Sequence, residues 1–129
     1  MQYRPLDPGR EFLVACLCAE WCGTCRDYRA GFEALQAHFP QMGLIWVDIE
    51  DSADHLGDID VENFPSILIQ RGEHVVFFGT VLPDHGLLRR LLETFAAQSV
   101  EESAAYAAAT PERRGWQTGH NLRALLREA

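Results

Sequence analysis

No run of apolar residues in this chain approaches the ~18 that a membrane-spanning helix needs, so we expect neither a membrane span nor a membrane partner. Basic residues are also scarce: 11 Lys and Arg stand against 19 Asp and Glu, which gives a net charge of −8. This charge argues against nucleic acid and anionic membranes as partners. Residues 1–9 lack the apolar core of a signal peptide, so we expect a cytoplasmic protein.

The chain has only four cysteines, and the expected compartment limits what they do. Stable structural disulfides are uncommon in the cytosol, so closely spaced cysteines there indicate redox or metal chemistry. The sequence also has no internal repeat. Its 129 residues, 47% of them apolar and 23% charged, suffice for one globular unit with a hydrophobic core.

Residues 21–25 read Trp-Cys-Gly-Thr-Cys and stand at the expected start of an amphipathic helix. Cysteines at i and i+3 share a helix face with their Cα atoms roughly 5 Å apart, inside the ~4.4–6.8 Å that a disulfide needs. The unpaired N–H groups and the positive dipole of a helix N-terminus favour a thiolate, which makes Cys22 the expected nucleophile. Cys25, one turn deeper, is then the resolving thiol. The spacing alone also fits two ordinary buried cysteines or half of a zinc site.

The other two cysteines, Cys16 and Cys18, are two residues apart in an expected strand and so share one face of it. That spacing makes a disulfide between them geometrically poor. We interpret both as small buried side chains beneath the site; the alternatives are extra redox partners or a four-thiolate metal or cluster site. A strand buried on both faces is an awkward donor of two thiolates, and the five histidines show no ligand spacing, so we predict no metal.

The apolar pattern predicts an α/β fold with a mixed central sheet of about four to five strands flanked by helices. The nearly continuous apolar run over 11–18 is typical of a strand buried on both faces. Apolar residues at positions 28, 32, 35 and 39 fall at helical spacing, and Pro40 ends that helix. The other expected elements are strands over 44–49, 66–70 and 74–78, a short helix over 52–60 and a helix capped by Asp84. The first two strands would be parallel and the last two a hairpin, with the cysteine motif at the C-terminal end of the first strand.

The composition changes near residue 97. Ser99 and Glu102 have the spacing of a capping box ahead of an alanine-rich helix, and further helices are expected from Thr110 and over 121–128. We therefore divide the chain into a domain over 1–98 and a helical extension over 99–129. The extension either packs on the domain or mediates association, for instance as a homodimer.

Several of these segments together resemble thioredoxins, over roughly residues 11–97. Residues 19–23 (Ala-Glu-Trp-Cys-Gly) match the family's approach to its cysteines, and residues 47–50 resemble its third strand. The loop Phe64-Pro65-Ser66 resembles the family's loop with a cis proline facing the cysteines, and Gly79 matches the glycine after the last strand. The resemblance implies a thioredoxin-like fold with a shortened N-terminus, and thiol–disulfide exchange through a Cys22–Cys25 couple. No cofactor is implied, and a separate reductase would recycle the couple.

The same resemblance assigns a substrate groove around the cysteines, formed by Trp21, Gly23, Thr24, Phe64, Pro65 and Gly79. Proline has no N–H to donate, so the polar edge offered to a substrate belongs to residue 64. An extended peptide could pair with that edge as an added strand. The expected partners are therefore protein disulfide substrates.

The chain departs from the family at the positions that handle protons. Cys16 stands where thioredoxins carry a buried aspartate, and Trp46 stands at the position of the accompanying lysine. Losing a costly buried charge pair need not destabilise the fold, but it removes the expected base for Cys25. Thr24 replaces the usual proline, which leaves the direction of the redox reaction open. We predict slower resolution or a shifted potential.

The sequence thus predicts a thioredoxin-like protein-disulfide reductase. The alternative is a thioredoxin-fold adaptor or assembly chaperone that binds partners without turnover, which the altered buried pair and the extra tail favour. A metal- or cluster-binding protein is a third reading.

Overall fold

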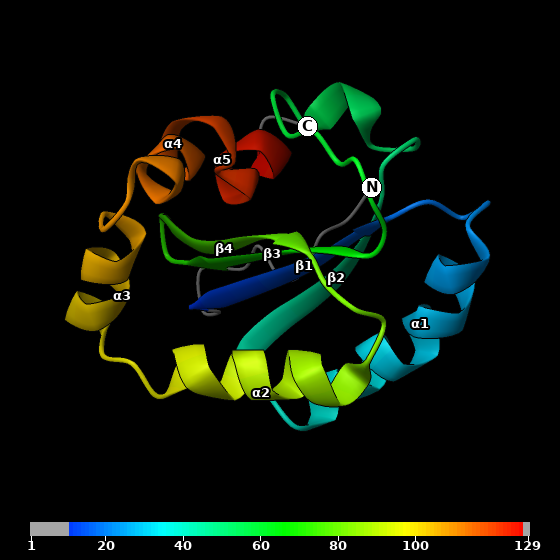
Figure 1. Cartoon of the computed structure of the whole chain (residues 1–129), viewed down its shortest axis with the longest axis horizontal. Helices are drawn as coiled ribbons and strands as arrows, with labels where there is room; N and C mark the ends of the chain where they lie inside the picture. Colours follow the sequence, from blue (N-terminus) through cyan, green and yellow to red (C-terminus); the bar gives the residue numbers. More distant parts are fainter. Residues whose placement is uncertain (1–10, 128–129) are drawn as a thin grey trace.

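The four strands of the protein form one mixed sheet in the order β2-β1-β3-β4. The computed structural model describes residues 11–127, and Figure 1 shows the sheet between two layers of helices. The strands are β1 (Phe12–Cys18), β2 (Met42–Asp48), β3 (Ser66–Arg71) and β4 (His74–Thr80). β1 runs parallel to β2 and antiparallel to β3, and β3 and β4 form a hairpin. The predicted mixed α/β sheet is confirmed.

Strand β1 lies in the middle of the sheet, and all seven of its residues are buried. Because side chains alternate along a strand, β1 feeds two separate cores. Phe12, Val14, Cys16 and Cys18 point into one core, and Leu13, Ala15 and Leu17 point into the other. This explains the nearly continuous apolar run in the sequence: neither face of the strand meets water.

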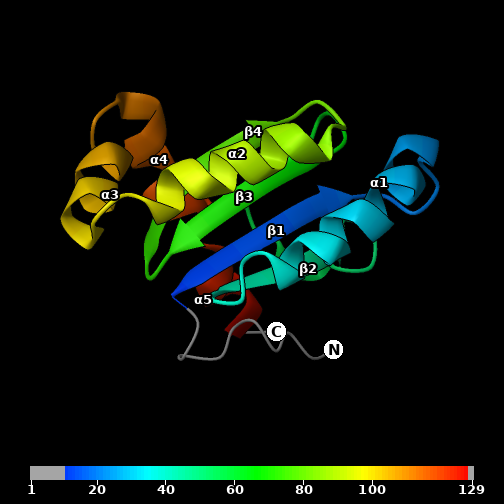
Figure 2. The same cartoon turned by 90° about the horizontal axis from the view of Figure 1, so that it is seen from below.

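Helices α1 (Gly23–Ala34) and α2 (His85–Ala96) cover the first core. Figure 2 shows both on the same side of the sheet. A 3₁₀ turn, η2 (Leu35–Ala37), continues α1. The Asp84 side chain caps α2 by accepting hydrogen bonds from the backbone N–H groups of Gly86 and Leu87, as the sequence predicted.

The C-terminal region forms three helices, α3 (Val100–Ala107), α4 (Pro111–Gly119) and α5 (Leu122–Arg127). Helices α4 and α5 close the second core, and Figure 1 shows them across the sheet from α1 and α2. Tyr106 of α3 packs instead against the first core. Leu122 and Leu126 of α5 are buried in the cluster that contains Leu13 and Leu17. The predicted capping box at Ser99 and Glu102 is present.

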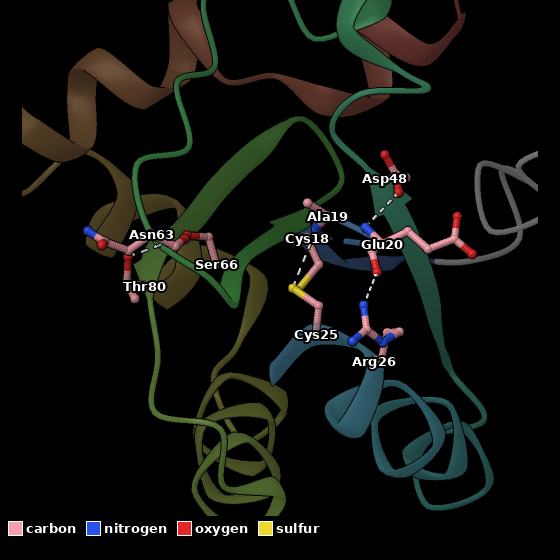
Figure 3. Close-up of a disulfide and its surroundings, with 9 residues drawn as sticks. All are labelled: Cys18, Ala19, Glu20, Cys25, Arg26, Asp48, Asn63, Ser66 and Thr80. Carbon is pink, nitrogen blue, oxygen red and sulfur yellow. Dashed lines mark hydrogen bonds between the residues drawn. A yellow bond between two sulfur atoms is a disulfide. The ribbon is translucent and has the colours of Figure 1, made fainter. Parts of the chain in front are cut away.

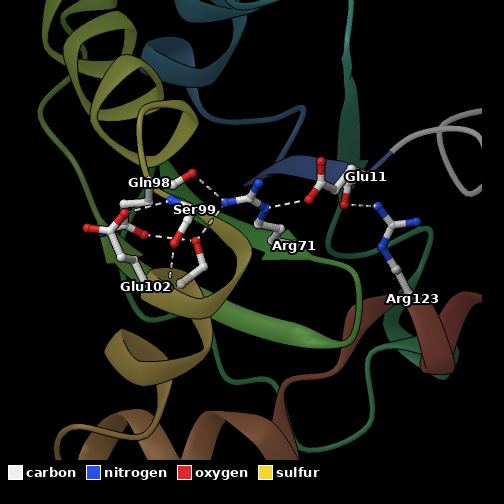
Figure 4. A network of polar contacts seen from close by, with 7 residues as sticks. Glu11, Arg71, Gln98, Ser99, Glu102 and Arg123 are labelled. Carbon is white, nitrogen blue, oxygen red and sulfur yellow. Dashed lines mark hydrogen bonds and ion pairs between the residues drawn. The ribbon is translucent and has the colours of Figure 1, made fainter.

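Polar contacts also fasten this extension to the sheet, as Figure 4 shows. The Arg71 guanidinium at the end of β3 donates to the Gln98 carbonyl at 2.9 Å and to Ser103 Oγ at 3.0 Å. The same group forms an ion pair with Glu11 at 2.6 Å, and Arg123 of α5 donates to the Glu11 carbonyl at 3.0 Å. The extension packs on the sheet; a role in association and the division of the chain at residue 98 remain predictions.

Two expectations need comment. The helix predicted over 52–60 is mostly wrong: only η3 (Ala53–His55), a single 3₁₀ turn, forms there, and Gly57 follows at a left-handed φ of +57° that ends any helix. The shortened N-terminus falls on residues 1–10, outside the described residues. Within residues 11–127, no helix is both long enough and apolar enough to cross a membrane.

Candidate redox site

The cysteine motif lies where β1 ends and α1 begins. β1 stops at Cys18, and a tight turn follows in which the Cys22 N–H donates to the Ala19 carbonyl at 3.0 Å. Cys22 is the N-cap residue of α1 and is partly exposed, and its side chain makes no capping hydrogen bond. Cys25 lies one turn further on and is fully buried. The predicted positions of the accessible and the deep cysteine are therefore those in the structure.

The disulfide in the structure joins Cys18 to Cys25, with their Cα atoms 5.8 Å apart. Figure 3 shows this bond between the end of β1 and the first turn of α1. The Ala19 N–H also points at Cys25 Sγ, 3.4 Å away. Cys22 and Cys16 are free thiols. The Cys22–Cys25 bond predicted from the motif is thus not the one that the structure holds.

The physical reason is the direction in which Cys18 faces. Cys18 is the last residue of β1, and its side chain points into the core beneath α1, where it meets Cys25. The sequence interpretation grouped cysteines by their spacing within one element, so it did not test a bond between strand and helix. The alternation along β1 was the available signal, because it already placed Cys18 on the same face as Cys16.

Two side chains of the first core near the disulfide, Cys16 and Tyr28, both stay protonated at neutral pH. Cys16 is fully buried, and burial raises the pKa of its thiol to about 12. Its register partner on β2 is Trp46, so the two positions of the family's charge pair do lie side by side. Burial also raises the pKa of Tyr28, whose hydroxyl has no hydrogen-bond partner within the described residues. Neither of these two groups is therefore a ready proton acceptor for Cys25 at neutral pH.

The structure brings together part of the predicted groove. Trp21 is 63% exposed and meets Phe64 edge to face, with ring centroids 5.6 Å apart. The Phe64–Pro65 peptide bond is cis, as the resemblance implied, and the Pro65 carbonyl accepts from the Val81 N–H at 3.0 Å.

The other predicted groove residues lie to either side. Gly23 is the first residue of α1, and Gly79 lies in β4 opposite Ile67. Thr24 opens instead toward α2, where it lines a separate cavity with Pro83 and His85. Thr24 thus lies where the first turn of α1 faces the start of α2.

Two acidic residues at the site were not singled out by the sequence analysis. Asp48 Oδ2, at the end of β2, accepts from the Glu20 N–H at 3.0 Å and so holds the turn before Cys22. Glu50 accepts from the Trp21 indole N–H at 2.7 Å. Both belong to a stretch over 48–62 that has seven Asp and Glu residues and no Lys or Arg. The signal was the parallel pairing of β1 and β2, because parallel strands end at the same edge of a sheet.

Comparison with known proteins agrees with the fold and with the cysteine motif. The family model described as Thioredoxin matches residues 6–91. A thioredoxin of Chlamydia trachomatis is 30% identical over 74 residues, which cover 57% of this chain and 72% of that protein. A thioredoxin of Ophiophagus hannah is 25% identical over 68 residues, covering 53% of this chain but only 65% of that one, just under two thirds of its length.

Among solved structures, a poplar thioredoxin h superposes with a TM-score of 0.62 at 18% identity, covering 70% of this chain and 80% of its own; this likeness supports the fold alone. The family model spans all four strands of the sheet, the whole of α1 and the first part of α2, and it includes the cysteine motif. The protein therefore belongs to the thioredoxin family.

Proposed function

We propose that this thiol–disulfide oxidoreductase of the thioredoxin family reduces protein disulfides, with Cys22 as nucleophile and Cys25 as resolving thiol. One observation carries the proposal: the N-cap residue of α1 has a free, partly exposed thiol, and it lies one turn before a cysteine that itself forms a disulfide. The arrangement supplies the attacking sulfur at the surface and the second sulfur behind it.

In the reaction, the Cys22 thiolate attacks one sulfur of a substrate disulfide, and the other substrate sulfur leaves as a thiolate and takes up a proton. Cys25 then attacks Cys22 Sγ in the mixed disulfide, and the second substrate thiol is released. The two electrons come from the pair of cysteines, which ends as a Cys22–Cys25 disulfide. A reductase must return those electrons, and no cofactor in this chain is required.

The aromatic pair and the proline loop are the proposed substrate surface. Trp21 and Phe64 flank the approach to Cys22, and Pro65 has no N–H of its own to donate. An extended peptide that adds along residue 64 would bring its disulfide to Cys22. Glu50 and Asp48 give this rim a negative character that favours substrates with basic neighbours.

The test is turnover of a model protein disulfide with dithiothreitol as the electron source. The Cys22→Ser variant is expected to lose on the order of 10³-fold or more of the rate, because the covalent pathway begins at this sulfur. The Cys25→Ser variant should accumulate mixed disulfide on Cys22. Cys16→Ala is the matched control, since it removes a thiol outside the proposed pathway. A Cys22→Ser rate equal to that of the unmodified protein would refute the proposal.

A partner-binding role without turnover remains the second candidate. It is favoured by the apolar pair Cys16 and Trp46 in place of the family's charge pair. Capture of a partner that survives the Cys22→Ser change would support it. The cytoplasmic location, the contribution to cell redox homeostasis and the homodimer also remain predictions, and the mass of the purified protein in solution tests the last of them.

A further inference from the structure

We propose that Cys18 is a third redox-active cysteine, and that the Cys18–Cys25 disulfide is a closed form of the site that exchanges with an open Cys22–Cys25 form. The inference rests on the proposed function, because it concerns the same Cys25. It assigns to Cys18 the control of whether Cys25 is available as the resolving thiol.

Cys25 is within reach of two different sulfurs. Cys18 approaches it from the end of β1 and is bonded to it, with a Cα separation of 5.8 Å. Cys22 approaches it from the preceding turn of α1, three residues earlier, which is also a spacing that a disulfide can bridge. Cys25 can bond to only one of them at a time, so the two disulfides exclude each other.

The two forms differ in what they expose. Cys18 and Cys25 are both fully buried, so in the closed form the bond is shielded from an external thiol. Of the four cysteines, all of which the structure describes, only Cys22 then offers an accessible thiol. A substrate captured by Cys22 in this form has no resolving thiol, because Cys25 is already bonded, and it stays attached. In the open form the oxidised pair includes Cys22 and is within reach of a recycling reductase.

The exchange between the forms is balanced without any added oxidant. The Cys22 thiolate attacks Cys25 Sγ, the Cys22–Cys25 bond forms as the Cys18–Cys25 bond breaks, and Cys18 leaves as a thiolate and takes up a proton. The reverse step forms the buried Cys18–Cys25 disulfide again and breaks the Cys22–Cys25 disulfide. The number of disulfides is one before and after.

Burial makes this exchange slow. Cys16, two residues before Cys18 on the same face of β1, shows what a free thiol experiences there, since burial raises its pKa to about 12. A buried thiol is a poor nucleophile and a poor leaving group at neutral pH. The closed and open forms should therefore persist long enough to be separated by acid quenching, on the scale of minutes that uncatalysed disulfide rearrangement takes.

The positions of the glutamates allow a direct test. Cleavage after glutamate gives one peptide over 12–20, with Cys16 and Cys18, and another over 21–33, with Cys22 and Cys25. The closed form links the two peptides, whereas the open form keeps its disulfide inside the second. The full-length protein is oxidised with diamide, quenched in acid, alkylated, cleaved and analysed by mass spectrometry.

We expect linked peptides from the unmodified protein, from Cys22→Ser and from Cys16→Ala, and their loss in Cys18→Ala. Cys16→Ala is the matched control for Cys18→Ala, because both change a fully buried thiol on the same face of β1. Absence of linked peptides from both the unmodified protein and Cys22→Ser would overturn the proposal. So would their retention in Cys18→Ala.

The exchange itself is measured by adding reduced glutathione to the oxidised proteins and following the linked peptides with time. The unmodified protein should lose them at least tenfold faster than Cys22→Ser, because only Cys22 offers an internal route to the buried bond. Equal rates would refute the exchange. These readouts do not depend on substrate turnover, so a protein that forms linked peptides but reduces no protein disulfide would refute the reductase proposal and leave the Cys18–Cys25 bond standing.

Discussion

The two ends of strand β1 are held in different ways. At its C-terminal end, Cys18 is bonded to Cys25, and the neighbouring turn leaves a thiol partly exposed. At its N-terminal end, Phe12 pairs with Arg71, whose guanidinium ties Glu11 to the start of the C-terminal extension. The C-terminal end therefore has the cysteines that can exchange disulfides. The N-terminal end has polar contacts that only stabilise the fold. Changes at the second end should therefore alter stability and leave the reactivity of Cys22 toward an alkylating agent unchanged.

Removing the residues after Gln98 should lower the stability of the fold more than any of the single substitutions below. The deletion uncovers a face of the sheet that carries Leu13, Leu17 and Leu68. Each buried leucine contributes ~1.5–3 kcal/mol, against a net stability of ~5–15 kcal/mol for a whole domain. We expect the shortened chain to lose cooperative thermal unfolding. An unchanged melting curve, together with an unchanged number of chains per particle in solution, would rule out both packing and association as roles of the extension.

A single residue of the extension should show the same effect on a smaller scale. Leu122 of α5 is fully buried in the second core, so Leu122→Ala should lower the free energy of unfolding by about 2–5 kcal/mol. Leu82→Ala is the matched control, because Leu82 is 69% exposed and its truncation should change stability by less than about 0.5 kcal/mol. Denaturant unfolding measures both. Equal losses in the two variants would show that α5 does not share the core of the sheet.

Much of this architecture could be predicted from the sequence, because its signals are local. The apolar run at β1, the cap at Asp84 and the capping box at Ser99 each depend on neighbouring residues, and the structure has all three. The Cys18–Cys25 bond is different in kind. It depends on how the last residue of a strand faces the first turn of the next helix, which the spacing of cysteines within one element does not reveal.

The contacts of Arg71 could not be predicted from the sequence either. Its partners Glu11, Gln98 and Ser103 lie between 27 and 60 residues away along the chain. Such contacts depend on the pairing of β1 with β3 and on the path of the extension, neither of which a local pattern contains. The same applies to Glu50, which lies 29 residues from its partner Trp21.

The hydrogen bonds of Arg71 at the N-terminal end of β1 should contribute less to the free energy of unfolding than the buried leucines do. Arg71→Met keeps the aliphatic part of the side chain but removes the guanidinium, which lies over the Phe12 ring and donates to the Gln98 carbonyl and to Ser103. We expect a loss of about 2 kcal/mol in the free energy of unfolding, since hydrogen bonds from charged groups contribute ~1.5–3 kcal/mol. The thiol of Cys22 should react with iodoacetamide at the same rate as before.

Arg127→Met is the control for the Arg71 change, because the ion pair of Arg127 with Glu73 joins two side chains that are 53% and 60% exposed. Exposed pairs of this kind contribute only ~0–1 kcal/mol. A loss at Arg71 no larger than the loss at Arg127 would show that the extension is held by its apolar contacts alone. A change in the alkylation rate of Cys22 would contradict the separation of the two ends.

The smallest expected effect tests the C-terminal end of β1 itself. Cys16→Asp places a carboxyl beneath the disulfide, where Cys16 now stays protonated because burial raises its pKa to about 12. The carboxyl could accept a proton from Cys25 and should shorten the life of the mixed disulfide on Cys22 on the order of tenfold. This is below the ~10²–10⁴-fold of a well-placed general base, because burial also disfavours the charged carboxylate. Cys16→Asn, of similar size but without an acid, is the control, and acid-quenched mass spectrometry of the mixed disulfide gives the rate. Equal lifetimes in the Asp and Asn variants would mean that proton transfer at Cys25 does not limit resolution, and that the apolar pair Cys16 and Trp46 has no effect on the rate of the site.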